Sequence, residues 1–222
     1  MSEERLDRLS DRIARLEQPH PERSFEIEDL AESPFEQFAT WLEEALAAGL
    51  HVPNSMTLAT ADRSGAASAR TVLLKGVDDE AFVFFTNYQS RKGRELAENP
   101  RAALVFHWAA LQRQVCVQGR VQPLESRESD AYFATRSLGS RLAAWASAQS
   151  EVLEDRAELD REVADARRRF GNDVPRPPHW GGFRVIPMRI EFWQARPNRL
   201  HDRLQYLRDA EDGPWRIVRL AP

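Results

Sequence analysis

RTVLLKGVDDEAFVFFTNYQSRKGRELAEN, residues 70–99, carries the strongest structural signal in this chain. Its two short apolar runs, residues 70–75 and 82–86, are rich in β-branched and aromatic side chains, which is typical of buried strands. The polar residues 77–80 between them predict a turn. A helix is then expected to begin at Ser90 and to end before the next proline, which cannot continue it. The stretch therefore predicts strand, turn, strand and helix in succession.

The predicted helix opens with two cations, Arg91 and Lys92. Cations in the first turn oppose the helix macrodipole, at a cost of up to about 1 kcal/mol. A bound phosphate would compensate, because the free N–H groups of the first turn already favour an anion. A solvated basic turn explains the helix alone equally well, and the nearby Arg70 favours phosphate. In a continuous strand Arg70 and Lys75 point to opposite faces, so we expect a second anion site at Lys75.

Composition bounds the class of protein. The chain has 222 residues and a net charge of −4 with interspersed signs, which suits one domain and gives no electrostatic footprint for nucleic acid or an anionic membrane. Cys116 is the single cysteine, so neither an intrachain disulfide nor a cysteine-based metal cage can form, and no metal site is expected. No apolar run approaches transmembrane length, and the first residues lack an apolar signal core. We expect a cytoplasmic protein that binds a small ligand.

Further strand-like runs surround the opening stretch. They are residues 56–60, 102–108, 112–121, 183–186, 189–194, 199–207 and 215–220. Short links between neighbouring runs favour an antiparallel sheet or small barrel over a doubly wound fold. Residues 125–136 and 151–170 have helical patterns, and the second helix is assigned to scaffold or subunit packing. The predicted fold class is α+β, mainly β, with peripheral helices.

The N-terminal part differs from the rest. Residues 1–18 predict an amphipathic helix that docks on its own domain or on another subunit, and residues 19–33 have the composition of a linker or mobile arm. Ser33 and Pro34 are typical of a helix start. The helix that follows is expected to bury its apolar residues, namely Phe35, Phe38, Trp41, Leu42 and Leu46. Residues 1–32 are therefore interpreted as an N-terminal helix and arm, and residues 33–222 as a single domain.

A second group of candidate anion ligands lies near the predicted helix 125–136. Tyr132 and Arg136 are four residues apart on one helix face, and Ser140 follows shortly after. Two hydroxyls and a guanidinium, together with Lys75, suit phosphate recognition. A surface pair plus a helix cap is the alternative interpretation of these residues.

Polar side chains on two other predicted strands are candidates to surround a planar ring. A buried Gln114 needs hydrogen-bond partners, which either the backbone or the polar edge of a ligand ring can supply. Arg199, His201 and Arg203 share one strand face at period two. Three such groups repel one another unless an anion or an electron-rich ring lies among them, although a solvated edge strand would also carry them. No Gly-rich dinucleotide fingerprint, P-loop or nucleophile with an obvious base partner occurs.

The sequence thus offers two separate clusters of candidate phosphate-binding residues, together with polar strand residues that could surround planar rings. This combination predicts a phosphorylated planar cofactor beside a phosphorylated planar substrate. Ordered motifs extend this interpretation: RTVLLK (70–75), SRK (90–92), RQV (113–115), QS (149–150), WGGFR (180–184), IEFWQ (190–194), RLHDR (199–203) and RLAP (219–222). In these motifs, from about Ser33 to the C-terminus, the chain resembles the pyridoxine/pyridoxamine 5'-phosphate oxidase family. The resemblance implies a split β-barrel homodimer with FMN bound at the subunit interface.

The resemblance also implies roles for residues at matching positions. The FMN contacts would be Arg70, Thr71, Val72, Leu73, Leu74, Lys75, Phe85, Thr86, Arg91, Lys92, Gln114, Gln149, Ser150, Trp193 and Arg203. The substrate contacts would be Lys75, Tyr132, Arg136, Ser140, Arg199, Leu200 and His201. Arg199 and His201 would be catalytic, flanking the pyridine ring, and His201 alone of the two titrates near neutral pH.

The implied reaction transfers a hydride from C4' of pyridoxine 5'-phosphate or pyridoxamine 5'-phosphate to the flavin, which O2 reoxidises. The products are pyridoxal 5'-phosphate and hydrogen peroxide, with ammonia from the amine. The flavin carries the redox chemistry and the protein positions it. Two alternatives are a paralogous FMN oxidase of the phenazine-biosynthesis type, which uses a larger unphosphorylated substrate, and a non-catalytic flavin-binding barrel.

The chain departs from the family pattern at two places. Related enzymes have an Arg-x-x-Tyr pattern in an N-terminal arm that helps to cover the substrate, whereas residues 16–27 contain no tyrosine. Arg23 is a candidate to substitute in part. Phe85 stands where a tyrosine is common, although its main chain can make the same contact.

Overall fold

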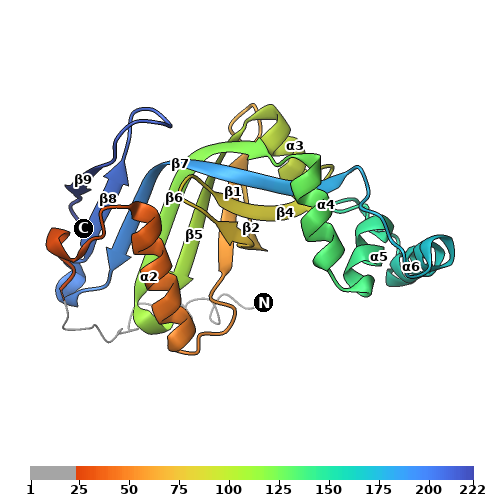
Figure 1. The fold of residues 1–222 in the computed structure, drawn as a ribbon, viewed down its shortest axis with the longest axis horizontal. Helices are drawn as coiled ribbons and strands as arrows, with labels where there is room; N and C mark the ends of the chain where they lie inside the picture. Colours follow the sequence, from red (N-terminus) through yellow and green to blue (C-terminus); the bar gives the residue numbers. More distant parts are fainter. Residues whose placement is uncertain (1–23) are drawn as a thin grey trace, which may run out of the picture.

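The computed structural model describes residues 24–222, so the predicted helix 1–18 and Arg23 lie outside the described residues. One nine-stranded antiparallel sheet dominates the described part (Figure 1). Its strands are β1 (Ser55–Ala61), β2 (Ala67–Leu73), β3 (Gly76–Val77), β4 (Phe82–Asn87), β5 (Arg101–Trp108), β6 (Arg113–Pro123), β7 (Trp180–Gln194), β8 (Asp202–Leu207) and β9 (Arg216–Arg219). The α-helices are α2 (Pro34–Ala47), α3 (Arg91–Glu98), α4 (Ser126–Thr135), α5 (Leu138–Ala146) and α6 (Arg156–Phe170), with 3-10 turns η1 (Ile27–Asp29), η2 (Ala109–Leu111) and η3 (Pro197–Arg199). The prediction of a mainly β fold with peripheral helices is confirmed.

Strand β7 organises the sheet. One of its edges pairs with β6 along nearly its whole length. The other edge pairs with β4 in its first part and with β8 in its last part. The sheet therefore curls and splits at β7, leaving β8 and β9 at one end of the molecule and α4, α5 and α6 at the other (Figure 1).

A glycine permits the bend in this long strand. The pairing of β6 with β7 shifts register between Gln118 and Gly119, which pair with Arg189 and Pro187, so Met188 has no partner on β6. A Cβ added at Gly119 would lie 2.1 Å from the carbonyl oxygen of Ile186, so only glycine allows the two backbones to approach this closely.

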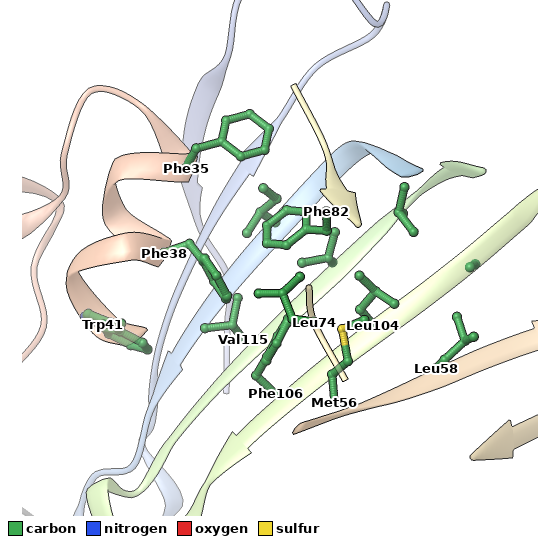
Figure 2. Close-up of a cluster of buried hydrophobic side chains, with 14 of the residues drawn as sticks. Phe35, Phe38, Trp41, Met56, Leu58, Leu74, Phe82, Leu104, Phe106 and Val115 are labelled. Atoms are coloured by element: carbon green, nitrogen blue, oxygen red, sulfur yellow. The ribbon is translucent and has the colours of Figure 1, made fainter. Parts of the chain in front are cut away.

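The core lies between the curled sheet and α2. Phe35, Phe38 and Trp41 point from the helix toward the strands, where Phe82 and Phe106 meet them (Figure 2). The Ser33 side chain caps the helix by accepting the N–H of Phe35, as its sequence predicts. The prediction that Leu46 is buried is wrong, because Leu46 is 58% exposed near the end of α2.

Residues 24–33, within the predicted linker or mobile arm, are mostly exposed but are anchored at two points. Phe25 is buried against Trp41, with ring centroids 5.0 Å apart, and its N–H donates to Asp202 Oδ2 at 3.0 Å. The carbonyl of Ala31 accepts the hydroxyl of Tyr206 at 2.5 Å. This segment is therefore anchored on β8.

Three expected elements differ in detail. The predicted strands 183–186 and 189–194 are one continuous strand, β7, because Pro187 sits at the bend without ending it. The run 70–75 is not a buried strand, since β2 is an edge strand of alternating exposure that ends at Leu73. The helix predicted from residue 151 begins only at Arg156, where Asp155 caps it, and Val152 is 97% exposed. No helix within residues 24–222 combines the length and apolar character needed to cross a membrane.

Replacement of Phe38 tests the core. Its ring is fully buried, and the ring centroid lies 4.9 Å from the centroids of both Phe82 and Phe106. We expect Phe38→Ala to lower the free energy of unfolding by about 3–5 kcal/mol, because it removes these contacts and leaves a cavity. Urea denaturation at one fixed protein concentration measures the change. The exposed Leu46 is the control, and Leu46→Ala should change stability by less than about 0.5 kcal/mol. Equal effects of the two substitutions would contradict this account of the core.

Candidate active site

A cavity of about 980 Å³ opens between the β2 edge, β4 and the helices α3, α4 and α5. The predicted site residues that line it are Arg70, Thr71, Val72, Leu73, Lys75, Phe85, Thr86, Arg91, Lys92, Tyr132, Arg136, Ser140, Gln149 and Ser150. Most of the residues expected to hold the cofactor and the substrate phosphate thus share one cavity within one chain. The expectation that Arg70 and Lys75 point to opposite faces of one continuous strand is wrong, because β2 ends at Leu73 and both residues line this cavity.

The first turn of α3 forms one cationic corner. Ser90 caps the helix as expected, with its hydroxyl accepting the N–H of Gly93. The buried Lys92 Nζ donates to Thr86 Oγ1 at 3.1 Å, Ser90 Oγ at 3.1 Å and Gln149 Oε1 at 3.0 Å. All three acceptors are neutral. Burial, and to a lesser extent the charge of Arg70, lower the pKa of Lys92 to about 8.

Arg91 and Ser150 complete this corner. The backbone N–H of Arg91 donates to Ser150 Oγ at 3.1 Å, and the Arg91 guanidinium donates through Nε to Glu95 Oε1 at 2.8 Å. The side chain of Arg91 is 61% exposed. The corner thus combines a helix N-terminus with a buried ammonium and an exposed guanidinium, which is a chemistry suited to phosphate.

A second cationic corner lies on α4 and α5. The Arg136 guanidinium stacks over Trp180, 4.6 Å from the ring centroid, and its Nη1 is buried with no hydrogen-bond partner among residues 24–222. Burial lowers the pKa of Arg136, as expected for a cation that lacks a counterion. Ser140 N and Oγ both bond to the hydroxyl of Ser137, which caps α5. An anion here would satisfy the unpaired donor of Arg136.

Three parallel rings form a wall of the cavity. Phe85 and Tyr132 stack at 3.9 Å between centroids and 16° between planes, and Phe85 and Trp180 at 5.4 Å and 11°. Because the Arg136 guanidinium stacks on Trp180, the wall also orients the second corner. Trp180 was not among the predicted site residues, although it is the first residue of the WGGFR motif.

Seven predicted site residues do not line this cavity: Leu74, Gln114, Trp193, Arg199, Leu200, His201 and Arg203. Leu74 is buried in the core, and its backbone N–H and carbonyl bond to Asn54. The others lie at the opposite end of the sheet, where Gln114, Trp193 and Arg203 pair in register across β6, β7 and β8. The ring of His201 lies 4.6 Å from that of Trp193.

The predicted period-two face of Arg199, His201 and Arg203 is wrong for its first two members. Strand β8 begins only at Asp202, and Arg199 ends the turn η3 with a left-handed φ of 61°. His201 Nδ1 accepts the N–H of Arg196 at 3.1 Å. Arg203 forms an ion pair with Glu191, with its Nε 2.7 Å from Oε1. The charge of Arg203 is therefore balanced inside the chain by a residue that the sequence analysis did not consider.

Comparisons with known proteins identify this arrangement. Residues 42–194 match the family model described as pyridoxamine 5'-phosphate oxidase, and residues 180–222 match that of the pyridoxine 5'-phosphate oxidase C-terminal dimerisation region. The chain belongs to the pyridoxine/pyridoxamine 5'-phosphate oxidase family. A pyridoxine/pyridoxamine 5'-phosphate oxidase of Burkholderia thailandensis is 56% identical over 211 residues, which cover 95% of this chain and 99% of the relative. The relative of Burkholderia pseudomallei strain K96243 has the same identity and coverage.

Solved structures agree with this family. PhzG from Burkholderia lata 383, in complex with tetrahydrophenazine-1-carboxylic acid, matches with a TM-score of 0.84 and 35% identity over 90% of this chain and 98% of that chain. A pyridoxamine 5'-phosphate oxidase-related, FMN-binding protein from Nostoc punctiforme matches with a TM-score of 0.69 at 16% identity, covering 87% of this chain and 100% of that chain, and shows the fold alone. The expected split barrel is confirmed. This member of the pyridoxine/pyridoxamine 5'-phosphate oxidase family is an oxidoreductase with FMN as its cofactor, and the match to the dimerisation region supports a homodimer.

The lowered pKa of Lys92 leads to a prediction for FMN binding. Lys92 is charged below its pKa of about 8 and loses its charge as the pH rises through that value. The phosphate of FMN is a dianion well above its second pKa of about 6, so it gains attraction only from the charged form of Lys92. We expect the dissociation constant of FMN to be nearly constant just below pH 8 and to rise by up to about tenfold per pH unit above it.

Flavin fluorescence titrations at increasing pH measure this dependence. Riboflavin, which lacks the phosphate, is the matched ligand, and its affinity should not show the rise. The same pH dependence for both flavins would contradict a role for the charge of Lys92 in phosphate binding.

Proposed function

We propose that the protein oxidises pyridoxine 5'-phosphate and pyridoxamine 5'-phosphate to pyridoxal 5'-phosphate in vitamin B6 metabolism, with the cytoplasm as its compartment. The alcohol and O2 give the aldehyde and hydrogen peroxide, and the amine, water and O2 give the aldehyde, ammonia and hydrogen peroxide. The observation that carries this proposal is the presence of two cationic corners in a single cavity. Two corners suit two phosphate-bearing ligands, a cofactor and a substrate.

The first corner fits the phosphate of FMN. Lys92 is buried among neutral acceptors, and the N-terminus of α3 and the exposed Arg91 lie next to it. A dianion would supply the counterion that Lys92 lacks and would raise its pKa again. The remaining cofactor contacts proposed in this chain come from the β2 edge, Phe85, Thr86, Gln149 and Ser150, all of which line the cavity.

The second corner fits the phosphate of the substrate. Arg136 has a buried Nη1 without a hydrogen-bond partner, and a phosphate oxygen would satisfy it. Tyr132, Ser140 and Lys75 line the same cavity and contribute two hydroxyls and an ammonium. A pyridine ring held by its phosphate at this corner would lie against the aromatic wall of Phe85 and Tyr132.

We assign the remaining site residues to a second subunit. Gln114, Trp193, Arg199, Leu200, His201 and Arg203 lie at the end of the sheet away from the cavity in their own chain. A two-fold homodimer uses the same patch of both subunits, so the end of one chain meets the cavity of its partner and the reverse. Each dimer then contains two equivalent sites with FMN at the interface, as the resemblance implies.

FMN, when bound, supplies the redox chemistry by accepting the hydride from C4' of the substrate and passing the electrons to O2. The protein binds, orients and holds protons. His201 Nδ1 accepts the N–H of Arg196, so the neutral imidazole carries its proton on Nε2. His201 is proposed to orient the substrate, while Arg199 holds the C4' substituent beside it.

The structural match to PhzG favours a second candidate, an FMN oxidase that acts on a larger unphosphorylated substrate. The second cationic corner favours a phosphate instead, because Arg136, Lys75, Tyr132 and Ser140 together offer more hydrogen-bond donors than the two oxygens of a carboxylate would use. A non-catalytic flavin-binding barrel would leave this corner without a role.

Anaerobic flavin spectroscopy tests the function. The FMN-loaded protein is mixed with pyridoxine 5'-phosphate or pyridoxamine 5'-phosphate without oxygen, and we expect the oxidised flavin absorbance to bleach. Admission of oxygen should restore it, with pyridoxal 5'-phosphate formed. Bound flavin that neither substrate reduces would refute the proposal and favour one of the two alternatives. Unphosphorylated pyridoxine is the control and should reduce the flavin far more slowly.

Mixing two inactive variants tests whether the site is shared between subunits. Arg136→Ala removes a cavity residue and Arg199→Ala a residue proposed to come from the partner, and both should lose turnover while they retain FMN. In randomly mixed dimers half are heterodimers with one intact site of two, so we expect about a quarter of wild-type activity to return. A mixture of Arg136→Ala with Tyr132→Phe, both cavity changes, should show no such recovery. No gain in the first mixture would contradict the shared site.

A further inference from the structure

Glu95 is a buried acid inside the cationic corner of α3. The residue is 5% exposed and lies one helical turn after Arg91. Its carboxylate accepts the hydroxyl of Thr60 at 2.5 Å and that of Ser68 at 2.6 Å. It also accepts Arg91 Nε at 2.8 Å and Arg70 Nη2 at 3.3 Å. One side chain thus connects β2, β1 and α3, of which β1 contacts both of the others.

Glu95 constrains its two arginine partners to different degrees. Arg91 is held at Nε, on the inner edge of its guanidinium, and the side chain stays 61% exposed at the cavity. Its two Nη groups therefore remain available to an anion. Arg70 is held more tightly, because it also donates to Leu58 O, Thr60 Oγ1 and Ser68 Oγ.

The charge of Glu95 also offsets repulsion among three cations. Arg70 lowers the pKa of Lys92, whereas Glu95 raises it. Burial alone would raise the pKa of Glu95, but hydrogen bonds from Ser68, Thr60 and Arg91 and the charge of Arg70 outweigh this and lower the pKa to about 2. Glu95 is therefore ionised at every pH at which the protein works.

We propose that Glu95 is a positioning residue for the FMN phosphate, which acts by fixing Arg91 and Arg70 at the cavity. Glu95 does not line the cavity, so its effect reaches the phosphate through these cations. The inference rests on the proposed assignment of Arg91 and Lys92 to that phosphate.

The isosteric replacement Glu95→Gln tests it. A glutamine can still bond to the hydroxyls of Thr60 and Ser68, but it has one acceptor oxygen in place of two and no charge for the guanidinium groups. We expect the dissociation constant of FMN to rise by about tenfold, as for the loss of one charge-assisted interaction. The affinity for riboflavin, which lacks the phosphate, should stay within about twofold of wild type, since the interaction concerns the phosphate alone.

Glu98 offers a matched control on the same helix. It is exposed, and within the described part of the chain it accepts only the backbone N–H of Arg63, at 3.4 Å. Glu98→Gln removes the same charge from α3 without touching the cluster, so both flavin affinities should remain at their wild-type values.

A double-mutant cycle shows through which residue Glu95 acts. If Glu95 positions Arg91, then Glu95→Gln should weaken FMN binding less in an Arg91→Ala background than in the wild type. An undiminished effect in that background would overturn a role through Arg91. Near-tenfold weakening in the wild type together with a reduced effect in Arg91→Ala would support it.

The remaining outcomes separate the inference from the function on which it rests. Tighter FMN binding by Glu95→Gln would overturn the inference and identify Glu95 as an anion that competes with the phosphate. Equal loss of FMN and riboflavin affinity would also overturn it, because Glu95 would then only support the fold. If instead Arg91→Ala alone leaves FMN binding unchanged, the proposed phosphate site fails; if Arg91→Ala weakens binding and Glu95→Gln does not, only the inference fails.

Discussion

The pairing of β7 with three other strands is the constraint on which the site depends. Its first part, with β4, carries Trp180 and the aromatic wall, and its last part, with β8, carries Trp193 next to His201. Trp180 and Trp193 are thirteen residues apart, which spans up to about 43 Å along an extended strand. One rigid strand thus holds the cavity and the second group of site residues apart in the same chain. This separation is the reason why we propose that two subunits share each site.

Local signals in the sequence were sufficient for most elements. The cap at Ser90 and the apolar runs of β1, β4, β5 and β6 depend on neighbouring residues, so the sequence predicted them well. The course of β2 and of residues 199–203 was predicted poorly. Their backbones follow contacts with distant segments, such as Leu74 with Asn54 and Arg203 with Glu191, which no local pattern reveals.

The candidate site was predicted in part for the same reason. Residues within the ordered motifs could be assigned by resemblance, and most of them line one cavity. Glu95 was overlooked, although its spacing of four from Arg91 is a recognisable helical ion pair. From the sequence, we expected one external anion to balance the cations of α3. The fold instead supplies an internal carboxylate, Glu95, which pairs with Arg70, whereas Lys92 donates to neutral acceptors. In the proposed complex, the protein and its ligand therefore share the charge balance of this corner.

The turn before β8 has a consequence for the evolution of stability. Asn198 and Arg199 are consecutive residues in the left-handed region, with φ of 58° and 61°. Such a conformation costs a non-glycine residue on the order of 1 kcal/mol, and glycine would adopt it with little strain. A glycine at position 199 would therefore make the chain more stable, but it would lack the guanidinium that we propose for substrate binding. In the proposed site, the arginine thus marks a trade-off in which the fold gives up some stability to keep a substrate-binding group in place.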